Sequence, residues 1–199
     1  MNFDDYCSDV YNDSMDIIRN DYAAYDNWED LYEELFMRVT GNDNGSYYCN
    51  YYEALEAVGD IVWDESYTRS YGSLPTNKGA EVCDVIVRCN ALAEMAQELK
   101  EEFEYFKMKE EGDAAVEKAY NIITLDEAYG CSFWDDELKM ATIIKDGMSH
   151  NSVSVFFVPK SEEYVVSVFL SDERVELDFT NDAEVDSQDI VDAVWEILE

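Results

Sequence analysis

The chain has 199 residues and a formal net charge of −34, because 47 acidic residues stand against 13 basic ones. Its hydrophobic content of 47% and aromatic content of 14% argue against intrinsic disorder, which is typical of charged chains that cannot form a core. Such a charge excludes direct binding to nucleic acid or to an anionic membrane, and it favours basic proteins as partners. The sequence shows no secretory signal and no run of about 18 to 20 apolar residues, so we expect a soluble, cytoplasmic protein.

The acidic residues are spread along the whole chain, and each quarter of it has a negative net charge. A folded monomer of this size exposes about 9,600 Å² of surface, so evenly spread net charges would lie roughly 17 Å apart. Duplex DNA carries one charge per ~1.7 Å of its axis. Imitation of DNA therefore requires the carboxylates to be concentrated on one face of the protein.

The first predicted element is an amphipathic helix that begins near Phe3 and ends near Ile18. Apolar side chains recur every three or four residues through this stretch, and acidic residues fill the other positions. One side of the helix should therefore face solvent and carry negative charge. The candidate partner-binding residues on this side are Asp9, Asp13 and Asp16.

A second helix is expected to begin after Asp26 or Asn27, whose side chains suit the N-cap position, and to end before Gly41. Trp28 and Leu35 belong to its predicted buried side. The candidate partner-binding residues on its outer side are Glu29, Asp30, Glu33 and Glu34.

Residues 41–46 have the composition of a turn, and helix is expected to resume from Tyr52 to Val62. The clearest element is a long amphipathic helix over residues 80–109, followed after Gly112 by a shorter helix over residues 114–123. Its steps of three and four would allow a coiled-coil homodimer, but Cys89 and Ala96 within the stripe favour packing against the earlier helices. The residues of this stripe are Val82, Val85, Cys89, Leu92, Ala96, Leu99, Phe103 and Phe106.

From Leu138 onward the apolar period changes to two, which is typical of strands. We predict an antiparallel meander with one solvent-facing side, and a terminal helix, capped by Ser187, that covers its apolar side. The predicted strands cover residues 138–145, 152–158, 164–170 and 174–179. The fold class is therefore α+β, with an acidic helical domain over residues 1–125 and a sheet-plus-helix domain over residues 126–199.

Catalytic and cofactor chemistry find little support, and we predict neither a catalytic residue nor a cofactor nor a bound metal. The single histidine, His150, lies in a predicted turn, and phosphate-binding glycine loops are absent from the sequence. Two acidic stretches fail as calcium loops. The one near Asp43 has Thr40 and Tyr51 at the end positions that need carboxylates, and the one near Asp182 has Ser187 in place of the turn glycine and Ala193 at its end. The five cysteines form no Cys-x-x-Cys pair, which favours reduced thiols.

Two segments carry a resemblance to known proteins: residues 39–56, VTGNDNGSYYCNYYEALE, and residues 78–95, KGAEVCDVIVRCNALAEM. They resemble paired motifs of small acidic proteins from phages and mobile elements of Clostridia-like bacteria, although Val82 stands where that family often has Trp. The resemblance covers residues 28–109. It implies a mobile-element protein directed at host defence, of the anti-CRISPR or anti-restriction type.

These observations lead to a functional hypothesis: the protein is a DNA mimic that occupies the basic cleft of a CRISPR effector nuclease or a restriction enzyme in a bacterial host cell. Arginines that normally bind phosphates would bind carboxylates instead, through the acids of the first two helices named above. The alternatives are an acidic interaction or dimeric assembly module without DNA mimicry, adaptation to high salt, and an enzyme that the sequence does not reveal.

Overall fold

The computed structural model describes residues 3–40, 77–147, 152–169 and 171–198. Its contacts divide the chain into two compact units, Met1–Phe106 and Lys107–Glu199. Helix α5 (Asn77–Ile123) contributes residues to both units, so the division falls inside this helix, whereas the sequence placed it after residue 125. The predicted turn at residues 41–46 and the predicted helix from Tyr52 to Val62 lie outside the described residues.

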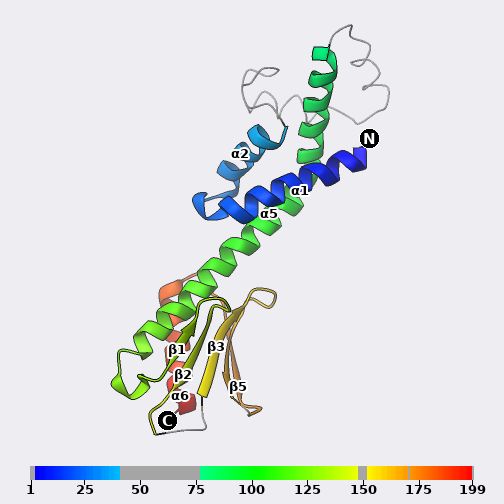
Figure 1. Ribbon diagram of the computed structural model, residues 1–199. Coiled ribbons are helices and arrows are strands. Elements are labelled where there is room, and N and C mark those ends of the chain that lie inside the picture. Colours follow the sequence, from blue (N-terminus) through cyan, green and yellow to red (C-terminus); the bar gives the residue numbers. More distant parts are fainter. Residues whose placement is uncertain (1–2, 41–76, 148–151, 170, 199) are drawn as a thin grey trace. The chain divides into compact units, whose positions relative to one another are not determined.

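The amino-terminal unit consists of helices, as the sequence predicts (Figure 1). Helix α1 (Phe3–Asp21) is followed by a short 3-10 helix, η1 (Tyr22–Ala24), and by helix α2 (Trp28–Thr40). Asn27 caps α2: its Oδ1 accepts the backbone N–H of Asp30 at 2.9 Å, and its Nδ2 donates to the Asp30 carboxylate at 2.8 Å. This exchange satisfies a backbone donor that the first turn of a helix otherwise leaves unpaired.

The core of this unit joins α1, α2 and the first part of α5. The ring of Trp28 in α2 lies 6.2 Å from the ring of Phe103 in α5, and Tyr22 of η1 stacks on Phe106 at 5.3 Å. From Cys89 to Phe106, the predicted stripe of α5 thus packs within the chain, as the first interpretation expects. Buried residues of this core include Val10, Ile18, Leu31, Leu35, Cys89, Leu92, Leu99 and Phe103.

The carboxy-terminal unit contains a five-stranded antiparallel sheet whose strands lie in sequence order, which is the predicted meander. The strands are β1 (Phe133–Asp135), β2 (Met140–Ile144), β3 (Ser152–Val158), β4 (Glu163–Val168) and β5 (Arg174–Asp178). The four predicted strands are present with small shifts of their ends. Strand β1 was not predicted, because three residues are too few for an alternating pattern to be recognised.

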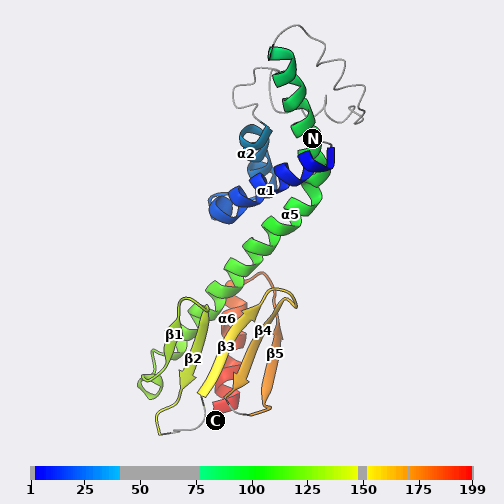
Figure 2. The same cartoon turned by 45° about the vertical axis from the view of Figure 1, so that its right-hand side comes forward.

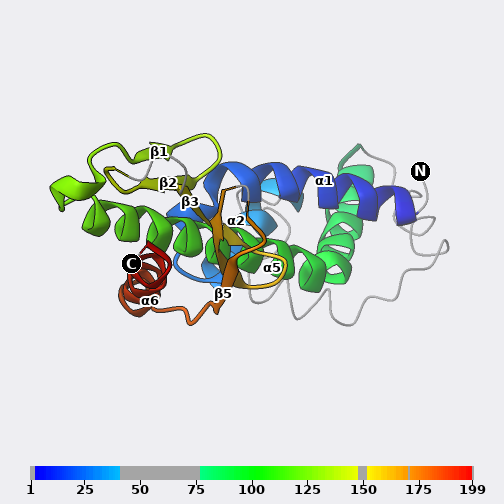
Figure 3. The same ribbon diagram turned by 90° about the horizontal axis from the view of Figure 1, so that it is seen from below.

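One face of the sheet is covered by helix α6 (Ala183–Leu198) and by the carboxy-terminal part of α5, as Figures 2 and 3 show. Ala115 and Val116 of α5 and Ile190 and Val194 of α6 are fully buried against this face. The sheet contributes Ala141, Ile143, Val153, Val155, Phe157, Tyr164, Val166 and Val168. The predicted cover of the sheet by the terminal helix is therefore confirmed.

Gly112 does not end a helix, so the prediction of a separate helix over residues 114–123 is wrong. The residue lies inside α5, and a Cβ atom at its position would come within 2.2 Å of the Phe157 ring. Real Cβ contacts are essentially never that short. Glycine is present here because the helix and the ring of β3 approach each other closely.

Replacement of Gly112 by Ala tests this contact. In an ordinary helix interior the change stabilises by about 1 kcal/mol. Here we expect overpacking against Phe157 to lower the free energy of unfolding of the carboxy-terminal unit by about 1–3 kcal/mol. Amide exchange of the sheet residues measures this quantity. A second change, Phe157→Leu, has a smaller side chain and should restore part of the stability that Gly112→Ala loses. If Gly112→Ala instead makes the protein more stable, the close contact between Gly112 and Phe157 is not the reason for the glycine.

Helix α6 is capped by Asp182, the residue before its first turn, and not by Ser187, so the predicted cap is wrong. The Asp182 carboxylate accepts the backbone N–H groups of Glu184 and Val185 at 3.1 and 3.2 Å. Ser187 is buried one turn further on, and its hydroxyl donates to the Glu184 carbonyl at 3.0 Å. The capping signal at Asp182 precedes the apolar periodicity of α6 by more than one turn.

Asp186, in the first turn of α6, is only 1% exposed and holds β4 to the helix. Its carboxylate accepts the Tyr164 hydroxyl at 2.7 Å and also the hydroxyl and backbone N–H of Thr180. Burial, and then the hydrogen bond to Asp186, raise the pKa of Tyr164, which therefore stays a donor at all ordinary pH values. A buried carboxylate is tolerated here because these donors compensate its desolvation.

We expect Tyr164→Phe to lower the free energy of unfolding of this unit by about 1–3 kcal/mol, because the buried Asp186 carboxylate loses a donor. The change is measured by amide exchange of the sheet residues at increasing denaturant concentration. Tyr120→Phe is the matched control, since that hydroxyl makes a long bond of 3.5 Å to the Ser132 carbonyl and should matter little. Equal losses in the two variants would contradict the role of Asp186.

Candidate protein-binding surface

The acidic side of α1 lies where its periodicity predicts. Asp9, Asp13 and Asp16 are exposed, while Val10 and Ile18 on the opposite side are fully buried. Spacings of four and three residues place successive acids about 6 and 4.5 Å apart along the helix axis. One strand of DNA advances about 3.4 Å per charge, so this row of carboxylates is somewhat less dense than a row of phosphates.

The acids of α2 divide into two pairs by their four-residue spacing. Glu29 and Glu33 are exposed on one flank, and Asp30 and Glu34 lie on the next. Glu34 is partly buried because it lies close to Arg38 and Tyr25. Helices α1 and α2 pack against each other through their apolar sides. The seven predicted acids thus belong to one unit but occupy the outer sides of two helices.

Most arginines of this unit bind acids of the same unit. Arg38 contacts Asp21 at 2.9 Å and Glu34 at 3.8 Å, and Arg19 lies 3.7 Å from Asp16. Lys100 forms a similar pair, at 3.6 Å, with Glu104 of α5. These exposed pairs add little stability, but they show that Arg19, Arg38 and Lys100 are engaged with acids of their own unit.

Arg88 has a more structural position. It donates to the Val39 carbonyl near the end of α2 at 3.1 Å, and it lies 3.5 Å from Asp13 of α1. Its side chain is 26% exposed. By contacting two helices from a third, Arg88 places a positive charge inside the packing of an acidic unit.

Within the described residues, the remaining predicted acids, Asp9, Glu29 and Glu33, form no ion pair. Asp30 is occupied by its exchange with Asn27 at the start of α2. The structure therefore separates the seven residues into three unpaired acids, one acid bound to the capping Asn27, and three acids that each pair with a different arginine: Asp13 with Arg88, Asp16 with Arg19 and Glu34 with Arg38. All seven lie on or near the surface.

A further acidic row lies on α5 and was not predicted as part of the site. Glu94, Glu98 and Glu102 follow one another at four-residue spacing and are exposed or partly exposed. Their neighbours in α1 are Cys7 and Tyr11, whose pKa values are raised by burial and then by these carboxylates. The spacing was visible in the sequence, but the apolar stripe of α5 gave no indication that this flank adjoins α1.

Two tyrosines stand among carboxylates in this unit. Burial raises the pKa of Tyr11, as do Glu102 and Glu98, while Arg19 lowers it. Burial likewise raises the pKa of Tyr25, as do Glu34 and Asp21, while Arg38 lowers it. Each tyrosine thus offers a neutral hydroxyl and a partly exposed ring next to acidic groups, a combination suited to protein interfaces.

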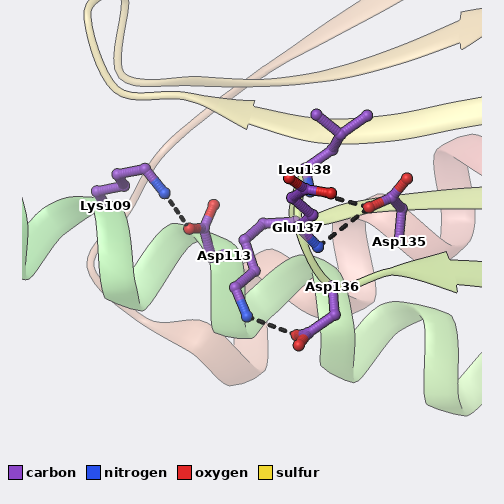
Figure 4. Close-up of polar contacts among 7 residues, drawn as sticks. Lys109, Asp113, Asp135, Asp136, Glu137 and Leu138 are labelled. Atoms are coloured by element: carbon purple, nitrogen blue, oxygen red, sulfur yellow. Dashed lines mark hydrogen bonds and ion pairs between the residues drawn. The ribbon is translucent and has the colours of Figure 1, made fainter.

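The acids of the β1–β2 turn show a different arrangement (Figure 4). The Asp135 carboxylate accepts the backbone N–H groups of Glu137 and Leu138 at 3.0 and 2.9 Å. Asp136 pairs with Lys139 at 2.6 Å, which lowers the pKa of Asp136 and raises that of Lys139. The Lys139 backbone has a φ of 51°, in the left-handed region. These carboxylates stabilise a tight turn, so their role is local.

The described part of the chain offers no site for a metal ion and no evident catalytic nucleophile. No group of three or more His, Cys, Asp or Glu residues there is placed to hold a metal ion. Cys7, Cys89 and Cys131 carry free thiols, and burial raises the pKa of Cys89 to about 11. His150 and Cys49 lie outside the described residues.

Comparison of the chain with protein-family models, with curated proteins and with solved structures finds no match. Among the described residues, no helix is both long and apolar enough to cross a membrane.

The position of Arg88 leads to a prediction on stability. Arg88→Met keeps much of the apolar stem but removes the donor to the Val39 carbonyl and the charge near Asp13. We expect the free energy of unfolding of the amino-terminal unit to fall by about 1–2 kcal/mol. Arg19→Met, which breaks a largely exposed pair, should change it by less than about 0.5 kcal/mol. Amide exchange of α1 and α2 compares the variants, and similar effects in both would contradict a structural role for Arg88.

Proposed function

We propose that this protein inhibits a nucleic-acid-binding defence enzyme of a bacterial host, foremost a CRISPR effector nuclease, by occupying its basic DNA-binding cleft. The observation that carries the proposal is the excess of exposed carboxylates on α1 and α2 over cations, which are already paired within the unit. A surface of this kind keeps its negative charge available to an outside partner.

The chemistry of binding follows from the target's own requirements. Clefts that hold DNA are lined by Arg and Lys, and Arg binds a carboxylate through two parallel hydrogen bonds as it binds a phosphate. In RNA-guided nucleases, the arginines that read the short duplex motif beside the target are poised for planar acceptors. Asp9, Glu29 and Glu33 are the acceptors best suited to them, because no cation of the described chain pairs with them.

The spacing of the acids also supports mimicry. The α1 row has a charge about every 5 Å along its axis, against about 3.4 Å for one DNA strand. An arginine of the cleft can therefore bind Asp9 directly, and others can bind Asp13 and Asp16 in competition with Arg88 and Arg19. Tyr11 and Tyr25 add contact area and hydroxyl groups beside the carboxylates.

The alternative function is an acidic interaction or assembly module without DNA mimicry. Its homodimeric form relies on the apolar stripe of α5, yet Leu92 and Leu99 are fully buried in the core of their own unit. The resemblance to mobile-element proteins directed at host defence also favours the inhibitor. We propose that it acts in the cytoplasm of the host cell, where such nucleases bind DNA.

The test uses purified Cas9-type nucleases and restriction enzymes, and it measures binding of the protein in competition with target DNA. We expect the protein to displace DNA and its affinity to fall steeply between about 0.05 and 0.2 M salt, because a cleft built for phosphates attracts it largely through charge. Changing all seven acids to Asn or Gln should abolish inhibition with little change in the unfolding temperature.

A matched control removes the same number of charges from exposed acids of the carboxy-terminal unit. These are Glu127, Glu137, Glu162, Asp172, Glu173, Asp189 and Glu196. We expect the control to lose less than about tenfold in affinity, since only long-range attraction weakens. If the two variants lose inhibition equally, total charge is responsible and the assignment to α1 and α2 is wrong. If the unchanged protein binds such enzymes without displacing DNA, the proposed mimicry is wrong.

A further inference from the structure

The face of the sheet opposite α5 and α6 differs in residue composition from the face that these helices cover. The strand register pairs Phe156 of β3 with Val165 of β4, and Met140 of β2 lies one residue beyond the last β2–β3 pair, Ala141 with Val155. The next row consists of Thr142, Ser154 and Ser167, with Phe133 of β1 beside Thr142. This face, which we call the open face, thus combines an apolar row with a row of small hydroxyl groups.

The open face is accessible within its unit, since no helix of the described residues of that unit covers it (Figure 2). Phe133 is 51% exposed, and Phe169, just after β4, is 59% exposed. Val165 is nevertheless only 1% exposed, because its cross-strand neighbours Phe156 and Glu176 flank it closely. Phe133 lies beside the hydroxyl row and Phe169 lies past the end of β4, so both exposed rings are on the same side of the apolar row. Exposed rings near an apolar row are typical of a surface that is covered when a partner binds.

Charged groups surround this apolar centre. Asp135 pairs with Met140 across β1 and β2, and Glu176 pairs with Val165 across β4 and β5. Glu163 and Asp178 are partners at the far end of the same face. Arg174 contacts Glu176 directly, so one cation stands against several carboxylates. The rim of the open face is therefore acidic.

We infer that the open face binds an amphipathic basic helix of a partner protein. The apolar side of such a helix covers Met140, Phe156 and the two exposed rings, and its Lys or Arg residues reach the rim. A helix is the matching shape because α6 and α5 already pack on the other face of the same sheet. This inference is independent of the proposed function, whose acids lie in the other unit.

Charge excludes the two other natural occupants. A second copy of the chain would bring another net charge of −34 against an acidic rim. Exposed aromatic rings on a sheet also stack on the bases of single-stranded RNA, but proteins of that kind supply cations for the phosphates. On the open face, the phosphates would be repelled by the carboxylates of Glu163, Glu176 and Asp178.

The test uses the full chain and a synthetic peptide of Leu and Lys, about 18 residues long, with Leu at helical spacing on one side. A scrambled peptide of the same composition has the same charge but no apolar side. We expect the amphipathic peptide to bind at about 0.15 M salt and to shift the NMR signals of β2, β3 and β4. Phe133→Ser with Phe169→Ser should weaken this binding about tenfold or more.

The matched control replaces two exposed apolar residues elsewhere in the unit, Leu125→Ser with Val185→Ser, which should change the affinity less than about twofold. The amphipathic peptide should still shift the sheet signals of the variant that lacks the seven acids of α1 and α2. This result would separate the open face from the proposed inhibitory surface. Equal binding of the scrambled peptide would overturn the inference, as would equal losses in the two double variants.

Two further outcomes also contradict it. If oligouridine shifts the NMR signals of β2, β3 and β4, the face binds RNA. If sedimentation shows self-association that the Phe133 and Phe169 changes abolish, the face binds a second copy of the chain. A large fall in unfolding temperature of that double variant would show that the face is covered within the chain.

Discussion

Helix α5 must supply an apolar side to two separate cores while the acids around it remain in water. It meets the amino-terminal helices with large side chains, among them Leu92, Leu99 and Phe103. Toward the sheet it changes to small residues, with Gly112, Ala115 and Ala119 at spacings of three and four. This change allows the sheet to approach the helix as closely as the Gly112–Phe157 contact requires. Each unit therefore depends on a different stretch of the same helix.

The distribution of charge follows from the same arrangement. A chain with a net charge of −34 folds only if the repulsion among its acids is weaker than the gain from apolar burial. Its buried acid, Asp186, has three donor groups, from Tyr164 and Thr180. Other carboxylates stabilise local structure: Asp126 and Asp182 cap helices, and Asp135 accepts hydrogen bonds in the β1–β2 turn. What remains exposed on α1 and α2 is a surplus that no fold-stabilising contact in the described chain requires.

The sequence allowed the helices and four strands to be predicted because hydrophobic periodicity is a local signal. The end of α2, the register-defining alternation of β3 and the cover of the sheet by α6 all follow from it. Gly112 was misinterpreted because a glycine that admits a distant ring looks the same as one that ends a helix. Strand β1 was missed because three residues are too few to show an alternating pattern. The cap at Asp182 was missed because it precedes the apolar periodicity of α6 by more than one turn.

The candidate surface was predictable to a similar degree. Helical spacing alone places Asp9, Asp13 and Asp16 on the outer side of α1. It cannot show that Arg88, 75 positions further along the chain, contacts Asp13, nor that Glu98 and Glu102 of α5 lie near Tyr11. Ion pairs between distant residues decide which carboxylates stay available, and they arise only when the helices pack. Exposure was thus predictable from sequence, and pairing was not.

The order of the sheet leaves β1 and β5 as its two edge strands. Unpaired backbone groups on an edge can recruit strands of other molecules, which is how many proteins begin to aggregate. Strand β5 carries Arg174, Glu176 and Asp178 at alternate positions, and β1 is only three residues long. Charged and short edges are the means by which natural sheets avoid such pairing. Both edges of the sheet can in this way stay uncovered without recruiting a strand of another molecule.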